Sequence, residues 1–249
     1  MKIVACYSNK GGVGKTATSV NIAYAAALKG QRTLLCDLDP QGASGFYFRV
    51  KPSKKLQEKS FFKDVKGLLA AIRGSDFPGL DLLPANLSFR DFDIFLSRMK
   101  NSRSRLKKAL KEMDSDYQVV ILDCPPNISL LSENVFKAAD TIVVPVIPTT
   151  LSARTLEQLY NFFKEKGYRR RKLVPFFSMV QKRKKLHQET MLALRTEYHH
   201  FLPTVIPFSS EIERMGVHRA PLATYAGRDP AALAYKAIWQ DIEKGLHAG

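Results

Sequence analysis

Cysteine is scarce in this sequence. The 249 residues contain three, Cys6, Cys36 and Cys124, and no pair has the Cys-x-x-Cys spacing. That excludes a disulfide scaffold and the usual structural zinc site. Long apolar runs are also missing, since none approaches about 18 residues, so no transmembrane helix is expected. The apolar stretch at residues 3–7 is too short for a signal peptide. We therefore expect a cytoplasmic protein.

Acidic residues are few compared with basic ones. The chain has 39 Lys and Arg but 23 Asp and Glu, a formal net charge of +16. Such an excess indicates a polyanionic partner, either nucleic acid or an anionic membrane surface, unless the basic residues form only a solvated face. The composition is 45% hydrophobic, which excludes a wholly disordered chain. No linker or repeat divides the chain, so we expect a single domain over residues 1–249.

The order of the predicted elements indicates the fold class. A buried strand at 2–8, a helix at 16–29 and a second strand at 32–37 form a β-α-β unit, which implies a parallel sheet. We expect further strands near 80–83 and at 117–123, 141–146, 173–178 and 204–207, and helices near 61–72 and at 88–113, 129–138, 152–166, 186–199 and from 229 to about 244. The pattern predicts an α/β fold, a doubly wound, mostly parallel sheet flanked by helices.

A glycine-rich loop separates the first strand from the first helix. It departs from the spacing GxxxxGK[ST] because the first glycine is missing, although its last three residues are intact. Glycines allow backbone N–H groups to surround phosphate oxygens, and the helix N-terminus adds a favourable dipole. Lys15 would reach the β- and γ-phosphates and Thr16 would bind Mg²⁺. The loop reads Lys10, Gly11, Gly12, Val13, Gly14, Lys15, Thr16, followed by Ala17.

Carboxylates follow two predicted strands at the edge where such sheets bind ligands. Asp37 and Asp39 come at the end of the second strand, and alternation places both on the same side of the chain. Asp123 ends the apolar run 119–122, as in a central strand that delivers one carboxylate to a metal. Capping or turn roles are the alternative for each of these acids.

These motifs together resemble those of the ParA/MinD family of ATPases. The loop is similar to their deviant Walker A motif, residues 37–41 (DLDPQ) to their switch I, and residues 119–126 (VVILDCPP) to their Walker B strand and switch II. The resemblance extends to the VPV run at 144–146 and to the VIP run at 205–207. It therefore implies a P-loop NTPase with ATP and Mg²⁺ as cofactors.

The resemblance also assigns roles to individual residues. It implies that Lys10 crosses to the partner's phosphates in a nucleotide-sandwich dimer, and that Asp39 positions or activates the attacking water. Asp37 would support the Mg²⁺ shell, with Thr16, Asp39 and Asp123 as the other metal-site residues. Pro207 would line the adenine pocket. The expected catalytic residues are Lys10, Lys15 and Asp39.

Two single positions and one run of four residues depart from the family pattern. Ala17 stands where a second threonine is usual, and Gln181 replaces a common acidic residue. Residues 208–211 (FSSE) replace an RNVR-like run, which removes one basic contact from the family's DNA-binding surface.

Basic residues are clustered around the predicted strand at 173–178. One cluster precedes this strand and the other follows it, so we expect the two at opposite edges of the domain. The stretch 98–111 adds seven basic residues and no acid. Arg183 matches a family position that contacts DNA phosphates. The expected DNA-binding residues are Arg169, Arg170, Arg171, Lys182, Arg183, Lys184 and Lys185. No recognition helix is evident, so binding should not depend on DNA sequence.

The resemblance favours a ParA-type partitioning ATPase. Such a protein forms a homodimer on ATP binding, coats nucleoid DNA non-specifically, and is stimulated by a ParB-like adaptor to position a plasmid, chromosome or protein body. A MinD-like membrane ATPase is one alternative, but it needs an amphipathic helix beyond the fold, and the last predicted helix carries core residues. A metabolic ligase related to dethiobiotin synthetase is the other.

Overall fold

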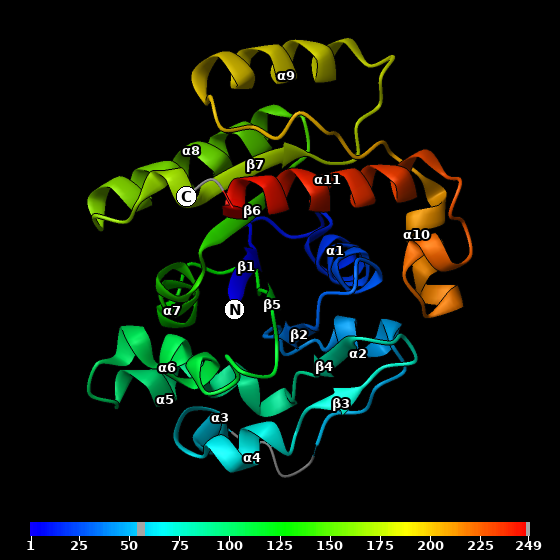
Figure 1. Cartoon of the computed structure of the whole chain (residues 1–249). Coiled ribbons are helices and arrows are strands. Elements are labelled where there is room, and N and C mark those ends of the chain that lie inside the picture. Colours follow the sequence, from blue (N-terminus) through cyan, green and yellow to red (C-terminus); the bar gives the residue numbers. More distant parts are fainter. Residues whose placement is uncertain (54–57, 248–249) are drawn as a thin grey trace.

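One sheet forms the centre of the molecule in the computed structural model, which describes residues 1–53 and 58–247. Its strands are β1 (Lys2–Cys6), β2 (Thr33–Asp37), β3 (Arg73–Gly74), β4 (Leu80–Leu83), β5 (Val119–Asp123), β6 (Thr141–Val146) and β7 (Leu173–Phe177). Their order is β3-β4-β2-β5-β1-β6-β7 (Figure 1). All neighbouring pairs are parallel except β3 with β4. The predicted parallel sheet is confirmed, with a short antiparallel strand at one end.

Helices connect the strands. They are α1 (Lys15–Leu28), α2 (Ala43–Tyr47), α3 (Glu58–Lys63), α4 (Val65–Leu69), α5 (Phe92–Ser97), α6 (Arg105–Lys111), α7 (Leu130–Ala138), α8 (Thr150–Glu165), α9 (Lys185–Glu197), α10 (Ser210–His218) and α11 (Pro230–His247). Short 3₁₀ turns are η1 (Leu87–Asp91), η2 (Ser102–Ser104), η3 (Arg170–Lys172) and η4 (Leu222–Thr224). No helix in the described ranges has the length and apolarity to cross a membrane.

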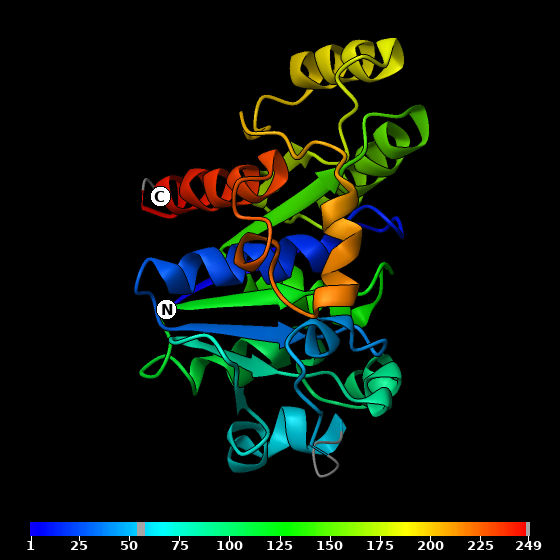
Figure 2. The same cartoon turned by 90° about the vertical axis from the view of Figure 1, so that its right-hand side faces the viewer.

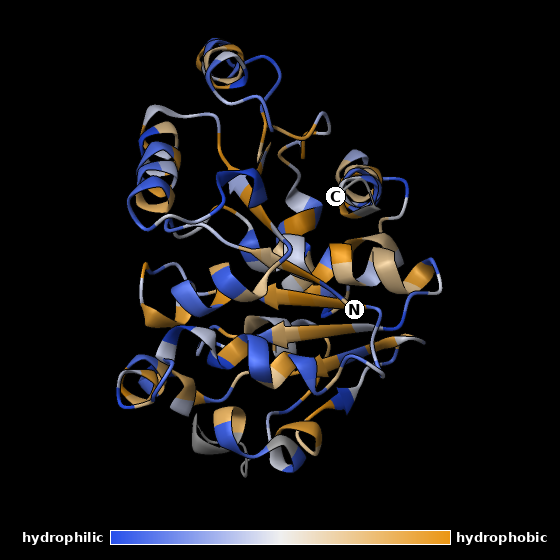
Figure 3. Cartoon of the chain, turned by 60° about the vertical axis from the view of Figure 1, so that its left-hand side comes forward, coloured by the Kyte–Doolittle hydropathy of each residue, from blue (hydrophilic) through white to orange (hydrophobic). Residues whose placement is uncertain are grey.

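Both faces of the sheet are covered, and successive side chains of β1 point alternately into the core on one face and the core on the other. Ile3, Ala5 and Tyr7 pack in the core on the side of α6, α7 and α8. Val4 and Cys6 pack in the core of α1 and α11 (Figure 1). The strands consequently read as continuous apolar runs, which Figure 3 shows as orange ribbon in the middle of the molecule. Helices on both faces confirm the doubly wound fold.

The parallel strands give the sheet two different edges. We call the edge where they end the carboxyl edge and the edge where they begin the amino edge. In Figure 2 the arrowheads point to the right, and both chain termini lie on the left. The loop after β1 and helix α10 therefore lie at the carboxyl edge, and the start of β1 and the end of α11 lie at the amino edge.

Three predicted elements differ from the structure. The helix expected at 88–113 is divided into η1, α5, η2 and α6, with Asn101 in the left-handed conformation at φ 54°. The helix near 61–72 is split by Asp64, whose carboxylate caps α4 by accepting the Gly67 N–H at 3.0 Å. The strand at 204–207 is reduced to a bridge between Val180 and Pro207, since proline has no N–H for a ladder.

Candidate functional site

The glycine-rich loop leads from β1 to α1 at the carboxyl edge. Gly12 and Gly14 have φ angles of +71° and +91°, which a side chain would strain. Gly14 also lies close to the segment after β7, because a Cβ there would stand 3.4 Å from Ser178 Oγ. The first N–H groups of a helix have no acceptor within the helix, so the start of α1 directs N–H donors and a positive dipole toward this loop. The loop can surround a phosphate group.

Lys15 places its charge inside the loop. Its side chain is buried, and Nζ donates a hydrogen bond to the Lys10 carbonyl oxygen at 3.1 Å. A buried ammonium is costly without an anionic partner, and none of the salt bridges in the described part of the chain includes Lys15. A phosphate in the loop would supply that partner.

Lys10 is directed toward its own chain. Nζ donates to Ser152 Oγ at 2.9 Å, and Ser152 also accepts a hydrogen bond from Thr149 Oγ1 at 3.2 Å. Ser152 lies in the first turn of α8, where the helix dipole is unfavourable for a cation. Sequence reasoning missed this contact, because 142 residues separate Lys10 from Ser152 and no motif connects them.

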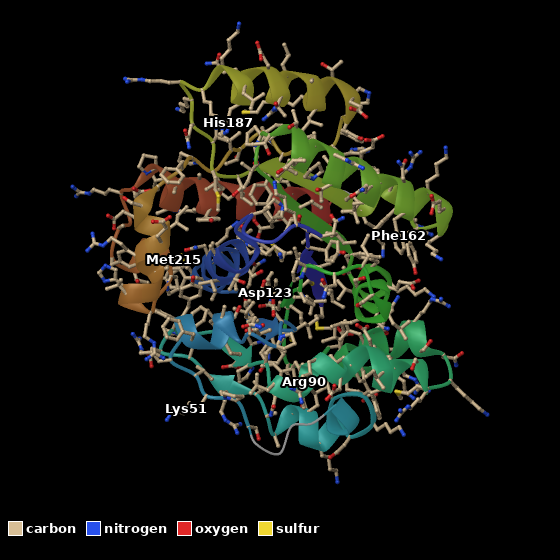
Figure 4. All side chains as sticks on the ribbon, turned by 180° about the vertical axis from the view of Figure 1, so that it is seen from behind. Lys51, Arg90, Asp123, Phe162, His187 and Met215 are labelled. Atoms are coloured by element: carbon tan, nitrogen blue, oxygen red, sulfur yellow. The ribbon has the colours of Figure 1, made fainter. Side chains whose placement is uncertain are left out.

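Asp37 and Asp123 are brought together by the sheet. They are partners in the register of β2 and β5, and both are buried. Asp37 accepts N–H bonds from Asp39 at 3.1 Å and Ser44 at 3.0 Å. Asp123 accepts the hydroxyls of Ser44 at 2.8 Å and Ser19 at 3.1 Å, and also that of Thr16. Figure 4 views this edge, with Asp123 labelled near its centre.

The electrostatics of this pair favour a cation. Burial raises the pKa of Asp123 to about 6, and the hydroxyls of Ser44, Thr16 and Ser19 limit that increase. Burial and then the charge of Asp123 raise the pKa of Asp37 well above its usual value. Within residues 1–53 and 58–247, no three Asp, Glu, His or Cys side chains form a metal cage. Mg²⁺ fits such a site, since it takes one or two carboxylates and completes its shell with phosphates and water.

The remaining predicted residues lie around this centre. Asp39 is half-buried and accepts the Gln41 N–H at 3.0 Å, so its carboxylate stands outside the buried pair. Pro207 lies beside the segment that follows β7, through its bridge with Val180. Ser19 and Ser44 were missed by sequence reasoning. The former lies one helical turn after Lys15, and that spacing could have indicated it.

The two basic clusters lie at opposite edges of the sheet. Arg169, Arg170 and Arg171 come directly before β7, at the amino edge, and residues 182–185 follow β7 at the carboxyl edge. All of these side chains are exposed. The third stretch, residues 98–111, is partly paired, since Arg103 forms a salt bridge with Glu133 at 2.9 Å.

Comparison with known proteins agrees with this geometry. A family model, AAA_31, described as an AAA domain, matches residues 1–174. The sporulation initiation inhibitor protein Soj of Bacillus subtilis (strain 168) is 28% identical over 247 residues, covering 97% of this chain and 98% of that protein. The chromosome partitioning protein ParA of Myxococcus xanthus (strain DK1622) is 32% identical over 159 residues, covering 63% of this chain and 56% of that protein.

Among solved structures, cobyrinic acid a,c-diamide synthase from Mycobacterium smegmatis with a bound ATP analogue and magnesium is similar, with a TM-score of 0.82. It is 27% identical, and the match covers 100% of this chain and 97% of that chain. The matched family model covers more than half of this sequence. The chain therefore belongs to the AAA_31 family, among the P-loop ATPases of the ParA/MinD type.

Proposed function

We propose that this chain is a ParA-type ATPase that hydrolyses ATP with Mg²⁺, dimerises around the nucleotide and binds DNA without sequence preference. The observation that carries the proposal is the arrangement at the carboxyl edge. Within residues 1–53 and 58–247, no salt bridge includes the buried Lys15 or the two buried carboxylates, and all three face one phosphate-binding loop. A nucleotide phosphate with bound Mg²⁺ satisfies both sets of charges at once.

Each site residue then has a defined part. The N–H groups of residues 10–17 hold the phosphates, and Lys15 neutralises the β- and γ-phosphate charge. Thr16, Asp37 and Asp123 hold the metal and its water shell. Asp39, outside the buried pair, orients the attacking water and accepts its proton. Pro207 lies where a base can pack against its ring.

The carboxyl edge also carries apolar side chains suited to a dimer interface. Many of the exposed large hydrophobic residues follow the ends of strands, and exposure at Leu151 and Phe208 reaches 67% and 54%. A sandwich dimer would cover this edge and place the partner's Lys10 near the phosphates. That lysine must first leave Ser152. The apolar residues at this edge are Phe46, Leu87, Ile128, Leu151, Leu186 and Phe208.

The partners we propose follow from charge and from relatives. A net charge of +16 with exposed clusters at 169–171 and 182–185 suits a polyanion contacted through its phosphates. The names of two relatives refer to sporulation initiation and chromosome partitioning. We therefore place the protein in the cytoplasm on nucleoid DNA, with a ParB-like adaptor that stimulates hydrolysis and links the ATPase to a cargo.

The test compares binding to random-sequence duplex DNA with ATP and with ADP, each with Mg²⁺, over a range of salt. We expect ATP to strengthen binding at least tenfold, and log affinity to fall with log salt at about −0.9 per phosphate contacted. Equal affinity in both nucleotides contradicts the proposed function. Binding to anionic vesicles instead would favour the MinD-like alternative, and DNA-independent turnover of a small carboxylated substrate would favour the ligase.

A further inference from the structure

Another group of basic residues lies at the amino edge, away from the glycine-rich loop. A cleft of about 330 Å³ opens there, between the start of β1, the start of β6, η3 and the end of α11. We call its basic residues, with the neighbouring Arg170, the amino-edge cluster. The cleft is lined by Lys2, Asp140, Thr141, Arg169, Arg171, Lys172, Gly245 and Leu246.

Two of the charges in this cleft are already bound to backbone. Lys172 Nζ donates to the carbonyl oxygens of Ala139 at 2.6 Å and Phe136 at 3.3 Å, at the end of α7. Asp140, the acid that lines the cleft, accepts the Ile3 N–H at 2.8 Å. These contacts fix the floor of the cleft, so its shape does not depend on a ligand.

Arg169 and Arg171 line this cleft, while Arg170 and Arg171 line a neighbouring hollow that also contains Glu157 and Glu197. Arg169, Arg170 and Arg171 are exposed, and their side chains form no hydrogen bond or salt bridge with any residue that the structure describes. Guanidinium groups bind phosphate oxygens through two parallel N–H bonds. The exposed guanidinium groups at this turn are therefore suited to phosphates of a nucleic-acid backbone.

The surroundings of the cluster favour DNA over a lipid surface. Binding in a membrane interface requires apolar side chains that enter the acyl region. No exposed large hydrophobic residue lies in the described segments 137–141 or 164–172. Charge alone, without an apolar contact, matches a phosphate backbone.

The cluster faces away from the partner in the proposed dimer. Strand β7 has five residues, so about 16 Å of strand separates η3 from the carboxyl edge. A nucleotide sandwich joins two carboxyl edges, which leaves the two amino edges directed outward. Resting on that proposed dimer, we propose that the amino-edge cluster is a second DNA-phosphate site that works without ATP, so that one ATP-bound dimer bridges two DNA duplexes.

The experiment measures capture of a second duplex. One random-sequence duplex is fixed to beads, the protein is added with ATP and Mg²⁺, and a fluorescent duplex is then supplied. We compare the parent with the triple variant Arg169→Ala, Arg170→Ala, Arg171→Ala. The control, Lys182→Ala, Arg183→Ala, Lys184→Ala, removes equal charge at the carboxyl edge. Thermal unfolding verifies that both variants are folded.

We expect the amino-edge variant to lose at least tenfold in captured duplex, while ATP still strengthens its binding to the first duplex relative to ADP. With ADP at low salt, the slope of log DNA affinity against log salt concentration should be less negative in this variant than in the parent by about 2 to 3. The reason is that three phosphate contacts are lost. The carboxyl-edge control should weaken ATP-dependent binding and keep the ADP-state slope.

Two results would overturn the inference. One is capture by the amino-edge variant equal to that by the parent, and the other is a parent that binds one duplex but captures no second. In the first case, loss of binding to phosphatidylserine vesicles in the variant would assign the cluster to lipid. These failures leave the proposed function intact, whereas equal parent affinity with ATP and ADP removes the proposed function itself.

Discussion

The charged side chains at the two edges of the sheet differ in burial. At the carboxyl edge Lys15, Asp37 and Asp123 are buried, and hydroxyls or backbone groups hold each of them. At the amino edge Arg169, Arg170 and Arg171 are exposed. A buried charge is costly unless its partner has the right geometry, which makes the first edge selective for one ligand. Exposed charges are screened by salt, so the affinity of the second edge for a polyanion should depend on salt concentration. Contacts of this kind with phosphates do not depend on nucleic-acid sequence.

The largest effect should come from the buried lysine. Lys15→Ala removes the charge that the loop holds for phosphate, and losing one partner of a desolvated pair costs about 3–5 kcal/mol. We expect ATP affinity to fall at least 100-fold, measured by isothermal titration calorimetry. Lys137→Ala, at an exposed lysine, is the control and should leave affinity within twofold. Unchanged ATP affinity in Lys15→Ala would show that the loop is not the phosphate site.

The next largest effect, on the rate of ATP hydrolysis, should come from Asp39, the acid outside the buried pair. Asp39→Ala should leave ATP binding intact and lower hydrolysis by about 10²–10⁴, the usual contribution of a positioned general base. The ATP-bound dimer should then persist, and size-exclusion chromatography with light scattering would detect it. If this variant hydrolyses ATP at the parental rate, Asp39 has no catalytic role.

A smaller effect is expected at Ser44, which holds both buried carboxylates. Its hydroxyl bonds Asp123 at 2.8 Å and favours the charged form, so Ser44→Ala should raise the pKa of Asp123 further above about 6. Groups that orient metal ligands typically contribute 10–100-fold to affinity. We expect about tenfold more Mg²⁺ to be needed for half-maximal ATPase rate at pH 7. Ser115→Ala, at an exposed serine, should not change that requirement.

The sequence predicted the parts of the fold that depend on local patterns. The apolar runs that became β1, β2, β5, β6 and β7, and the loop with glycines at positive φ, were all recognisable. Contacts between distant segments were not. The pairing of Asp37 with Asp123 depends on strand register, and Lys10 meets Ser152 only because β1 and β6 are neighbours. Helix ends were missed where one residue interrupts an otherwise helical pattern, as Asn101 does.

The smallest expected effect concerns the contact that holds the turn of residues 182–184 at the carboxyl edge. His187 Nδ1 accepts the Gln181 N–H at 3.1 Å, which fastens the turn that carries residues 182–184. Figure 4, which views the carboxyl edge, labels His187 near the top. At the amino edge the turn that carries the arginines is held by a different group, Lys172, whose Nζ donates to the Ala139 and Phe136 carbonyl oxygens. The structure of the turn that His187 fastens should therefore depend on pH.

Burial, and then the charge of Lys184, lower the pKa of His187 below its ordinary value of 6.5. The folded state prefers the neutral ring, so the stability from this contact is complete above about pH 6.5 and is lost as pH falls through the lowered pKa. Exchange of the Gln181 amide, corrected for its intrinsic rate, should rise severalfold between pH 7.5 and 5, because one hydrogen bond contributes about 1 kcal/mol. His187→Asn keeps an acceptor that does not titrate, and its exchange should stay flat. A parallel rise in that variant would mean that the turn opens with the general gain of positive charge, in which case the two edges differ only in burial and not in how their basic residues are held.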